Sequence, residues 1–150
     1  MTFPEPAAPS TSVDQQELID ALVRVSFATM AVLSRVAAEH DVSLTQLRVL
    51  AILRDRRIKM SELADYLGLD KSTISGLVDR AEKRGLLQRA PNPADGRAVD
   101  VFLTTGGAQL AETGADEVAR SLAPMIGQLS RPDARRLATL LERILGHGGL

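Results

Sequence analysis

Residues 60–89 constrain the fold more than any other stretch, because they predict two short helices joined by a tight turn. In the first half, Leu63, Ala64 and Leu67 recur at helical spacing. Gly68 follows them and can adopt the left-handed conformation that ends a helix. The pattern therefore predicts the first helix and the turn of a helix-turn-helix.

The second half of this stretch predicts an amphipathic helix. Asp70 is a suitable N-cap, and Gly85 can end the helix. The apolar residues between them fall on one face, at i, i+3, i+4 and i+7: Ile74, Leu77, Val78 and Ala81. One side of this helix is thus expected to pack against the first helix and the core.

The other side of the second helix carries small hydrogen-bonding residues first and cations later. These residues are Ser72, Thr73, Ser75, Gly76, Asp79, Arg80 and Lys83. A helix fits the major groove of DNA, where short side chains can approach base edges while amides and basic groups hold phosphates. The pattern favours DNA binding, and the alternative is the solvated face of an ordinary helical hairpin.

Composition limits the functions that remain. The chain has 150 residues, 45% of them hydrophobic, which suits a single domain with its own core. It has no cysteine, which excludes disulfides, thiolate metal sites, cysteine nucleophiles and thiol redox switches. No apolar run is expected to approach the roughly 20 residues of a membrane helix, and no signal peptide is expected. The sequence therefore predicts a cytoplasmic protein with no membrane contact.

Charge is concentrated where DNA contact is suspected. The net charge is −1, yet residues 54–97 hold ten Lys and Arg against seven Asp and Glu. Within this region Arg54, Arg56, Arg57 and Lys59 form a basic cluster, interpreted as a patch facing the phosphate backbone. The local excess of +3 supports an interaction with nucleic acid, although it is small.

An enzyme is not expected. His40 and His147 are far apart in the sequence, and no nucleophile with a base, phosphate-binding loop or metal-ligand cluster appears. We therefore predict no catalytic residue, no metal and no cofactor.

Long helices are expected outside the central region. Residues 1–13 contain three prolines and predict a disordered arm. Residues 14–40 predict a helix that is apolar over most of its circumference, as in a dimerisation helix or, alternatively, the core helix of a monomer. Residues 44–55 predict a further helix, capped by Ser43 or Thr45.

A β-hairpin is predicted directly after the second helix of the helix-turn-helix. Residues 86–89 and 99–103 have strand character, with Val99, Val101 and Leu103 expected on one face. The prolines, Asn92 and the Asp95-Gly96 pair between the strands favour a loop. Arg97 lies just past the tip, where it could enter the narrow minor groove, although an exposed arginine would look the same.

These residues resemble a known family. The run from Ser61 to Arg89, the hairpin with Asp95 and Arg97, and the Leu-Thr pair at residues 103–104 resemble the MarR family of bacterial transcription regulators. The resemblance extends in layout over residues 14–146, and its specific motifs lie between residues 60 and 104.

The resemblance implies a mainly α-helical dimer with a winged helix-turn-helix. Lys71 to Lys83 would be the recognition helix, with Asp95 steadying the basic side chains of the wing and Arg97 entering the minor groove. Gly76 departs from the larger or basic residue usual in the family, although a glycine could allow close approach of the backbone. The predicted DNA-binding residues are Ser61, Lys71, Ser72, Thr73, Ser75, Gly76, Arg80, Lys83, Arg89, Asp95 and Arg97.

The chain is expected to end in helices of the dimer interface. A helix from Thr104 toward Ala123 would be kinked or ended by Pro124, and Ser130 would cap a last helix. That helix carries the apolar residues Leu137, Leu140, Leu141, Ile144 and Leu145. Residues 44–104 are thus predicted as the DNA-binding part of a single domain spanning residues 14–150, with 14–40 and 105–146 as dimerisation helices.

The predicted function is a homodimeric, sequence-specific regulator of transcription that binds a near-palindromic operator in double-stranded DNA, as a repressor released by a small molecule. Alternatives are a winged-helix module for protein contacts and a DNA binder without ligand control. The family often binds small aromatic or amphipathic acids between the dimer helices and the winged domain. Candidate effector-binding residues, each of which also suits a core or surface role, are Phe27, Met30, Arg48 and Tyr66.

Overall fold

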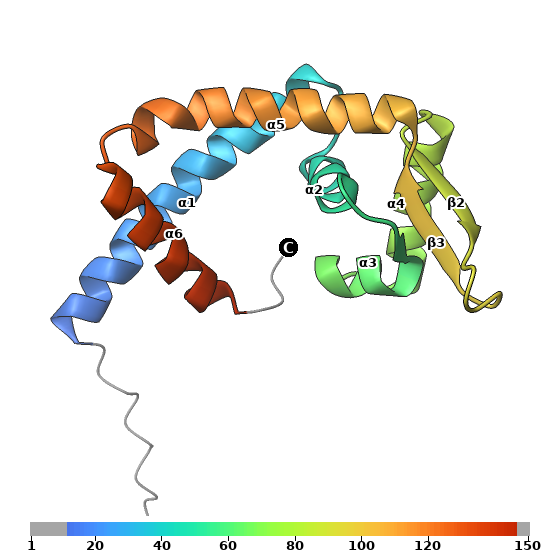
Figure 1. The fold of residues 1–150 in the computed structure, drawn as a ribbon, viewed down its shortest axis with the longest axis horizontal. Helices are drawn as coiled ribbons and strands as arrows, with labels where there is room; N and C mark the ends of the chain where they lie inside the picture. Colours follow the sequence, from blue (N-terminus) through green and yellow to red (C-terminus); the bar gives the residue numbers. More distant parts are fainter. Residues whose placement is uncertain (1–11, 147–150) are drawn as a thin grey trace, which may run out of the picture. The chain divides into compact units, whose positions relative to one another are not determined.

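The computed structural model describes residues 12–146, which are mainly helical with one small sheet (Figure 1). The predicted arm, apart from residues 12 and 13, lies outside these residues, as does His147. The elements are α1 (Val13–Glu39), α2 (Leu44–Leu53), β1 (Ile58–Lys59), α3 (Met60–Leu67), α4 (Lys71–Lys83), β2 (Leu87–Pro91), β3 (Val99–Leu103), α5 (Thr105–Ile126) and α6 (Arg131–Leu145). The mainly α fold with a small β wing is as predicted.

The chain divides into two compact units, with the boundary between Ala31 and Val32 inside α1. The first unit consists, in its described part, of the N-terminal portion of α1. The second contains all the other elements and the core. The division into a DNA-binding part and dimerisation helices stays a prediction.

The turn of the helix-turn-helix forms because the helix ends on both sides of it are capped as the sequence predicts. Gly68 adopts φ 63° after α3, and its N–H donates to Ala64 O and Asp65 O. Asp70 Oδ1 accepts the N–H of Thr73 at 2.7 Å and so begins α4. At the start of α3, the side chain of Glu62 accepts the N–H of Lys59 at 3.1 Å.

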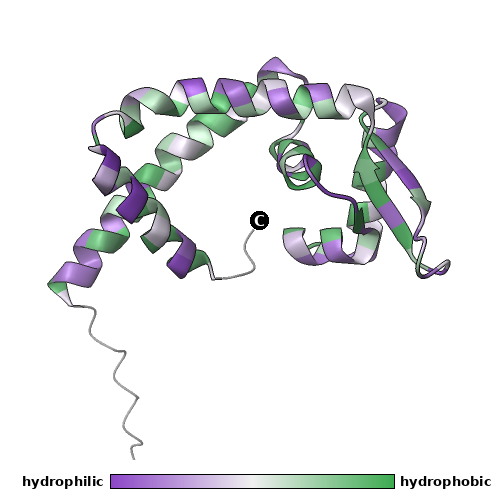
Figure 2. Ribbon diagram, viewed as in Figure 1, coloured by the Kyte–Doolittle hydropathy of each residue, from purple (hydrophilic) through white to green (hydrophobic). Residues whose placement is uncertain are grey.

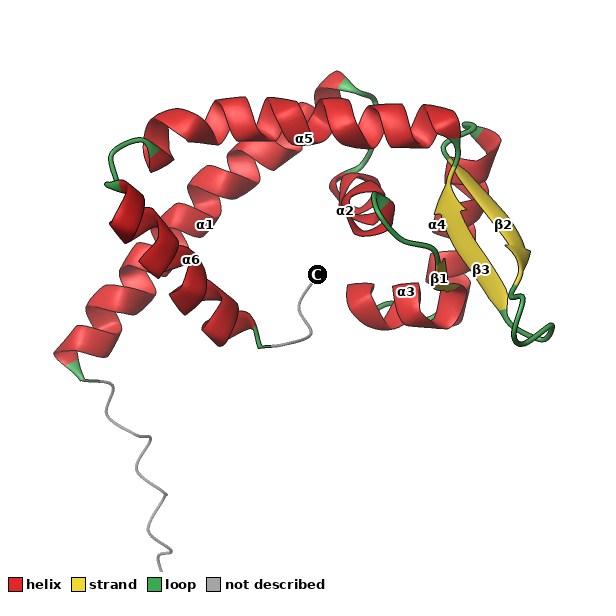
Figure 3. Cartoon of the chain, in the orientation of Figure 1, coloured by secondary structure: helices red, strands yellow, loops and turns green. Residues whose placement is uncertain are grey.

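The sheet has three antiparallel strands in the order β1-β3-β2 (Figure 3). The hairpin of β2 and β3 pairs Leu87 with Leu103 and Pro91 with Val99. β1 was not predicted, because its two residues have no periodicity and form a strand only by pairing with Asp100 and Val101. Val99 is not buried as expected, since it is 41% exposed at the loop end of the hairpin, where it pairs with Pro91.

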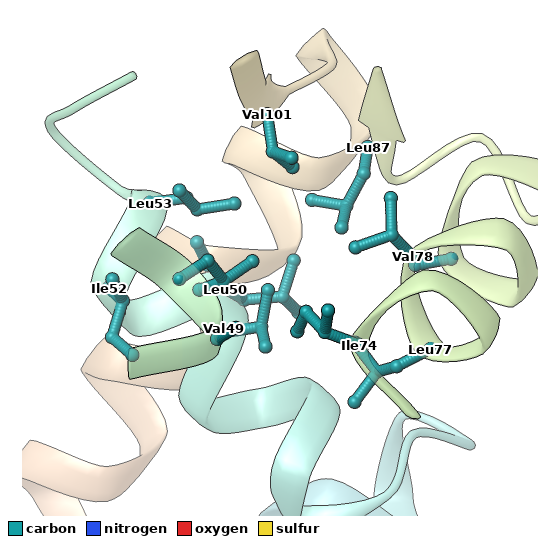
Figure 4. Packing of buried hydrophobic residues seen from close by; sticks show 13 residues of the cluster. Val49, Leu50, Ile52, Leu53, Ile74, Leu77, Val78, Leu87 and Val101 are labelled. Carbon is teal, nitrogen blue, oxygen red and sulfur yellow. The ribbon is translucent and has the colours of Figure 1, made fainter. Parts of the chain in front are cut away.

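The main core lies where α2, α4 and the hairpin converge (Figure 4). It contains Val49, Leu50, Ile52, Leu53, Leu63, Ala64, Ile74, Leu77, Val78, Ala81, Leu87, Val101 and Ala111. All four residues predicted for the apolar face of α4 belong to it, which confirms the orientation of that helix. A smaller cluster of Val36, Ala37, Val42 and Leu47 joins the end of α1 to α2 within the second unit.

Two helix ends differ from expectation. α2 stops at Leu53, two residues before the predicted end. Pro124 does not end α5, which continues to Ile126 and closes with Gly127 N–H donating to Ala123 O. A proline this close to the C-terminal end of a helix removes only one backbone hydrogen bond, because it lacks an N–H, so the helix can continue past it.

α1 and α6 retain many exposed apolar side chains. Figure 2 shows hydrophobic residues in green along both helices. In α6 no residue is buried, and Leu137, Leu140 and Leu141 are 45%, 42% and 38% exposed. α1 is long and apolar enough, by length and composition alone, to cross a membrane. The expectation that no run approaches that length is therefore wrong, because Arg24 is the one charged residue between Asp20 and Arg35.

Candidate nucleic-acid interface

A groove of about 720 Å³ lies between the start of α3, the N-terminal half of α4 and the hairpin. It is lined by Lys59, Met60, Ser61, Ala64, Lys71, Ile74, Ser75, Arg89, Ala90, Pro91, Arg97, Ala98 and Val99. Five predicted DNA-binding residues, from three separate elements and the loop, thus line one concave surface. Those five are Ser61, Lys71, Ser75, Arg89 and Arg97.

The N-terminus of α4 presents the small polar residues outward. Lys71, Ser72 and Thr73 are exposed, while Ser75 is half-buried at the groove. Ser72 Oγ donates to Asp70 Oδ1 at 2.9 Å, so this carboxylate accepts from two residues of the first turn. Bonds from the Thr73 backbone and from Ser72 hold the pKa of Asp70 below its usual value. The charged carboxylate therefore caps α4 through two hydrogen bonds from its first turn.

Gly76 leaves space that Arg80 uses. A Cβ at position 76 would lie 3.4 Å from Arg80 Nη1, so the guanidinium lies beside the glycine one turn earlier on α4. Arg80 and Lys83 are both exposed. Position 76, where the family usually has a larger residue, therefore lies next to Arg80. Direct contact of Gly76 with DNA stays a prediction.

Arg89 differs from the other predicted cations because its charge is compensated within the protein. Its guanidinium Nη2 lies 2.5 Å from Asp79 Oδ1 and 2.7 Å from Glu82 Oε2. The hydrogen bond from Arg89 to Glu82 is the main cause of a raised Arg89 pKa. The two carboxylates on α4 thereby fasten β2 to the helix, which favours a structural role over a phosphate contact.

Lys71, Arg80, Lys83 and Arg97 contrast with Arg89. Among the described residues, none of these four cations forms an ion pair. Their charges therefore remain available to an anionic partner.

The loop of the hairpin is built around Asn92 and Asp95. Asn92 Oδ1 accepts the N–H groups of Ala94 and Asp95, each at 2.9 Å. Asp95 Oδ1 accepts the backbone N–H of Arg97 at 3.1 Å. The contact of Asp95 with Arg97 is thus to the backbone of the arginine, and the guanidinium remains exposed.

The loop end of the hairpin contains a buried charge that sequence reasoning missed. Asp100 is 3% exposed, and its Oδ2 accepts from Arg57 Nε at 2.7 Å while Oδ1 accepts from Asn92 Nδ2 at 2.8 Å. The signal in the sequence was an aspartate inside the apolar strand Val99–Leu103 with an arginine cluster upstream. Pairing of β1 with β3, which the sequence did not predict, places Arg57 beside it.

The basic cluster is consequently not a uniform patch. Arg54 lies 3.7 Å from Glu112, Arg56 pairs with Asp55 at 3.3 Å, and Arg57 pairs with Asp100. Each of these arginines has a carboxylate neighbour within the protein. The role of the cluster as a patch facing the phosphate backbone stays a prediction.

Because of Asp100, the free energy of unfolding should fall as the pH is lowered into the acid range. Hydrogen bonds from Asn92 and Arg57 hold its pKa below the ordinary value of 3.8, against the opposing effect of burial. Because the folded-state pKa is lowered, the stabilisation is present above the unfolded pKa and is lost as pH falls through the folded value. We expect wild type to unfold at higher urea than Asp100→Asn at about pH 7, and this gap to narrow at about pH 3. Equal gaps at both pH values would contradict this.

The four candidate effector residues fall in both units. In the second unit Arg48 Nη2 donates to the carbonyl of Tyr66 at 3.2 Å, which brings α2 and α3 together. Phe27 and Met30 lie in the first unit, 73% and 44% exposed. Arg48 and Tyr66 are therefore neighbours, while an effector site containing all four stays a prediction.

Known proteins with similar sequences decide the family. The model of the MarR family matches residues 40–98. The transcriptional regulator PecS of Dickeya dadantii is 29% identical over 143 residues, which cover 93% of this chain and 86% of PecS. The multiple antibiotic resistance protein MarR of Escherichia coli is 33% identical over 107 residues, which cover 70% of this chain and 74% of MarR. The chain belongs to the MarR family.

A further relative and a solved structure are also similar to this chain. The transcriptional repressor NicR of Pseudomonas putida is 33% identical over 103 residues, covering 67% of this chain and 65% of NicR. A mutant of MarR from E. coli, solved in complex with operator DNA, superposes with a TM-score of 0.68 at 28% identity and covers 87% of this chain and 94% of its own. The relatives are transcription regulators, so this MarR-family member is a transcription regulator and not an enzyme, as predicted.

Proposed function

We propose that this MarR-family regulator binds an operator in duplex DNA as a homodimer, with α4 in the major groove and the β2-β3 hairpin, the wing, along the minor groove. The observation that carries this is the groove that joins Lys71 and Ser75 of α4 to Arg97 of the wing. Its walls present uncompensated cations and small hydroxyl groups, which match phosphates and base edges respectively. The operator-bound structure of the E. coli relative supports this assignment.

The proposal is tested by fluorescence anisotropy with a labelled duplex from the promoter of the protein's own gene. We expect a preference for one near-palindromic site over scrambled duplex of equal length, and affinity that falls steeply with salt. Affinity that is independent of salt, or equal for both duplexes, would contradict sequence-specific binding. It would favour the alternative, a winged-helix module for protein contacts.

The homodimer is supported by the apolar residues that α6 and α1 leave uncovered within one chain. A second copy of the chain would bury these faces, because a two-fold interface is formed by the same surface of both subunits. Two copies of α4 would then contact successive major grooves about 34 to 36 Å apart.

Replacing Leu141 of α6 by glutamate should convert the dimer to monomer. A carboxylate placed in an apolar interface without a partner is strongly unfavourable, and each dimer would contain two. Thr139→Glu is the matched control, because it introduces the same charge on the opposite side of the helix. Sedimentation should show a monomer for Leu141→Glu alone. A dimer that persists in Leu141→Glu would show that α6 is not at the interface.

We further propose that the protein is a repressor and that a small aromatic or amphipathic acid releases it. The repressor names among the relatives and the exposed guanidinium of Arg48 beside Tyr66 support this. An acid would relieve repression only if it binds the DNA-incompetent arrangement more tightly. Thermal-shift screening of aromatic acids, followed by DNA-release assays, tests it. Ligands that stabilise the protein without changing DNA affinity would argue for a regulator without ligand control. A regulator of this kind acts in the cytoplasm, where its DNA is.

A further inference from the structure

Asp100 carries a charge that the proposed DNA contacts do not use. Within residues 12–146 it is the one polar or charged residue in the buried set, at 3% exposed. A buried carboxylate is costly unless it is hydrogen-bonded, and here both oxygens accept bonds, from Arg57 and Asn92. Its two partners come from different parts of the chain, the loop before β1 and the loop of the wing.

Asn92 extends these bonds toward the tip of the wing. Its amide nitrogen donates to Asp100, which orients its oxygen toward the N–H groups of Ala94 and Asp95. Asp95 in turn accepts the N–H of Arg97, and the backbone N–H of Asn92 donates to Ala98 O at 2.9 Å. A continuous series of hydrogen bonds therefore runs from Arg57 to the backbone of Arg97.

Arg57 is itself held on three sides. Besides its bond to Asp100, its Nη2 donates to Pro91 O at 3.3 Å, and its guanidinium lies 4.7 Å from the centroid of the Phe102 ring. Contacts with a carboxylate, a carbonyl and an aromatic face fix a planar cation in one orientation. Arg57 thus links β2, β3 and the loop before β1 at the point where the strands of the wing meet its loop.

We propose that Arg57, Asp100 and Asn92 are positioning residues that hold the wing, and with it Arg97, in the DNA-binding pose before DNA arrives. A loop ordered in advance does not lose conformational entropy on binding, so affinity rises without any new contact. This inference rests on the proposed function, because an ordered wing raises affinity only if the wing contacts DNA.

Asp100→Asn is the sharpest variant because it keeps the size of the side chain. An amide has one accepting oxygen, so it cannot accept from both Arg57 and Asn92 with two separate oxygens. Arg57→Met removes the other end of the series while keeping a long apolar side chain over Phe102. Arg56→Met is the matched control, since it removes the same charge from the adjacent residue, whose partner is Asp55.

Each variant is made with Arg97 intact and with Arg97→Ala, and operator affinity is measured by anisotropy. With Arg97 intact, Asp100→Asn and Arg57→Met should each weaken binding about tenfold, and Arg56→Met by much less. With Arg97→Ala, the further weakening should largely vanish, because residues that act through Arg97 are coupled to it. An equal weakening in both backgrounds, or none at all, would overturn the proposal.

Amide hydrogen exchange supplies a readout that does not depend on DNA. The N–H groups of residues 94, 95 and 97 should exchange faster in Asp100→Asn than in wild type, with exchange in α2 unchanged. Unchanged exchange at these three residues would overturn the positioning role by itself. Wild-type protein that binds no duplex would instead overturn the proposed function, so the two failures are distinguishable. If Arg57→Met does not fold, Asp100→Asn decides the outcome.

Discussion

Replacing Arg97 by alanine will weaken operator binding roughly a hundredfold. Removing one specific arginine contact costs about 1 to 3 kcal/mol, and a dimer has two of them. Arg97 is exposed, lines the groove, and has its backbone held by Asp95. Its guanidinium is thus free to enter a narrow minor groove, where the negative potential is strongest.

Fluorescence anisotropy at fixed salt measures this weakening, and Arg136→Ala is its control. Arg136 is an exposed arginine on α6, so its removal changes the net charge equally without altering the groove. Lys71→Ala should behave differently from both, weakening binding to all duplexes and reducing the salt slope by about one for each phosphate that the lysine neutralises. Equal affinities for Arg97→Ala and Arg136→Ala would show that the wing does not contact DNA.

Replacing Gly107 by alanine will lower the free energy of unfolding by about 3 kcal/mol, the upper range for overpacking. Gly107 is buried in the first turn of α5, and a Cβ there would lie 1.9 Å from Leu86 O and 2.9 Å from Leu86 C. These are backbone atoms, and the same carbonyl accepts the N–H of Thr104 at 3.1 Å. Relief of the clash would therefore require α5 to move away from the segment that leads into β2.

Gly106→Ala is the matched control for Gly107→Ala. A Cβ at the adjacent position would meet Gly85 O at 3.5 Å, an ordinary van der Waals distance. Alanine also favours helix over glycine by up to about 1 kcal/mol, so Gly106→Ala should be neutral or stabilising. Urea unfolding at equal protein concentration compares the two variants. Similar midpoints for both would contradict the close packing of α5 against Leu86.

Much of the fold was predictable because its signals are local. Gly68 takes the left-handed conformation, and Asp70 and Ser130 cap α4 and α6, because each satisfies orphan groups of its own helix. The apolar spacing of α4 is also local, and it determined which side of that helix packs inward and which side faces outward. The bond from the Lys59 N–H to Glu62 at the start of α3 is equally local.

For the candidate site, the sequence predicted which residues would lie together better than it predicted what each residue does. Lys71, Ser75 and Arg97, which were predicted to contact DNA, line one groove. Arg89 was indistinguishable from them in the sequence, yet Asp79 and Glu82 compensate its charge. Whether a cation is free or paired depends on which carboxylates the fold brings near it, and sequence spacing does not report that.

The helices, their caps, the face of α4 that packs inward and the presence of a wing follow from the amino-acid sequence, because they depend on residues within a few positions of each other. Three other features needed the folded chain: the two residues of β1 form a strand, Arg57 meets Asp100, and Gly107 touches Leu86. Such contacts arise when distant segments close on a common core, so they depend on packing over the whole unit.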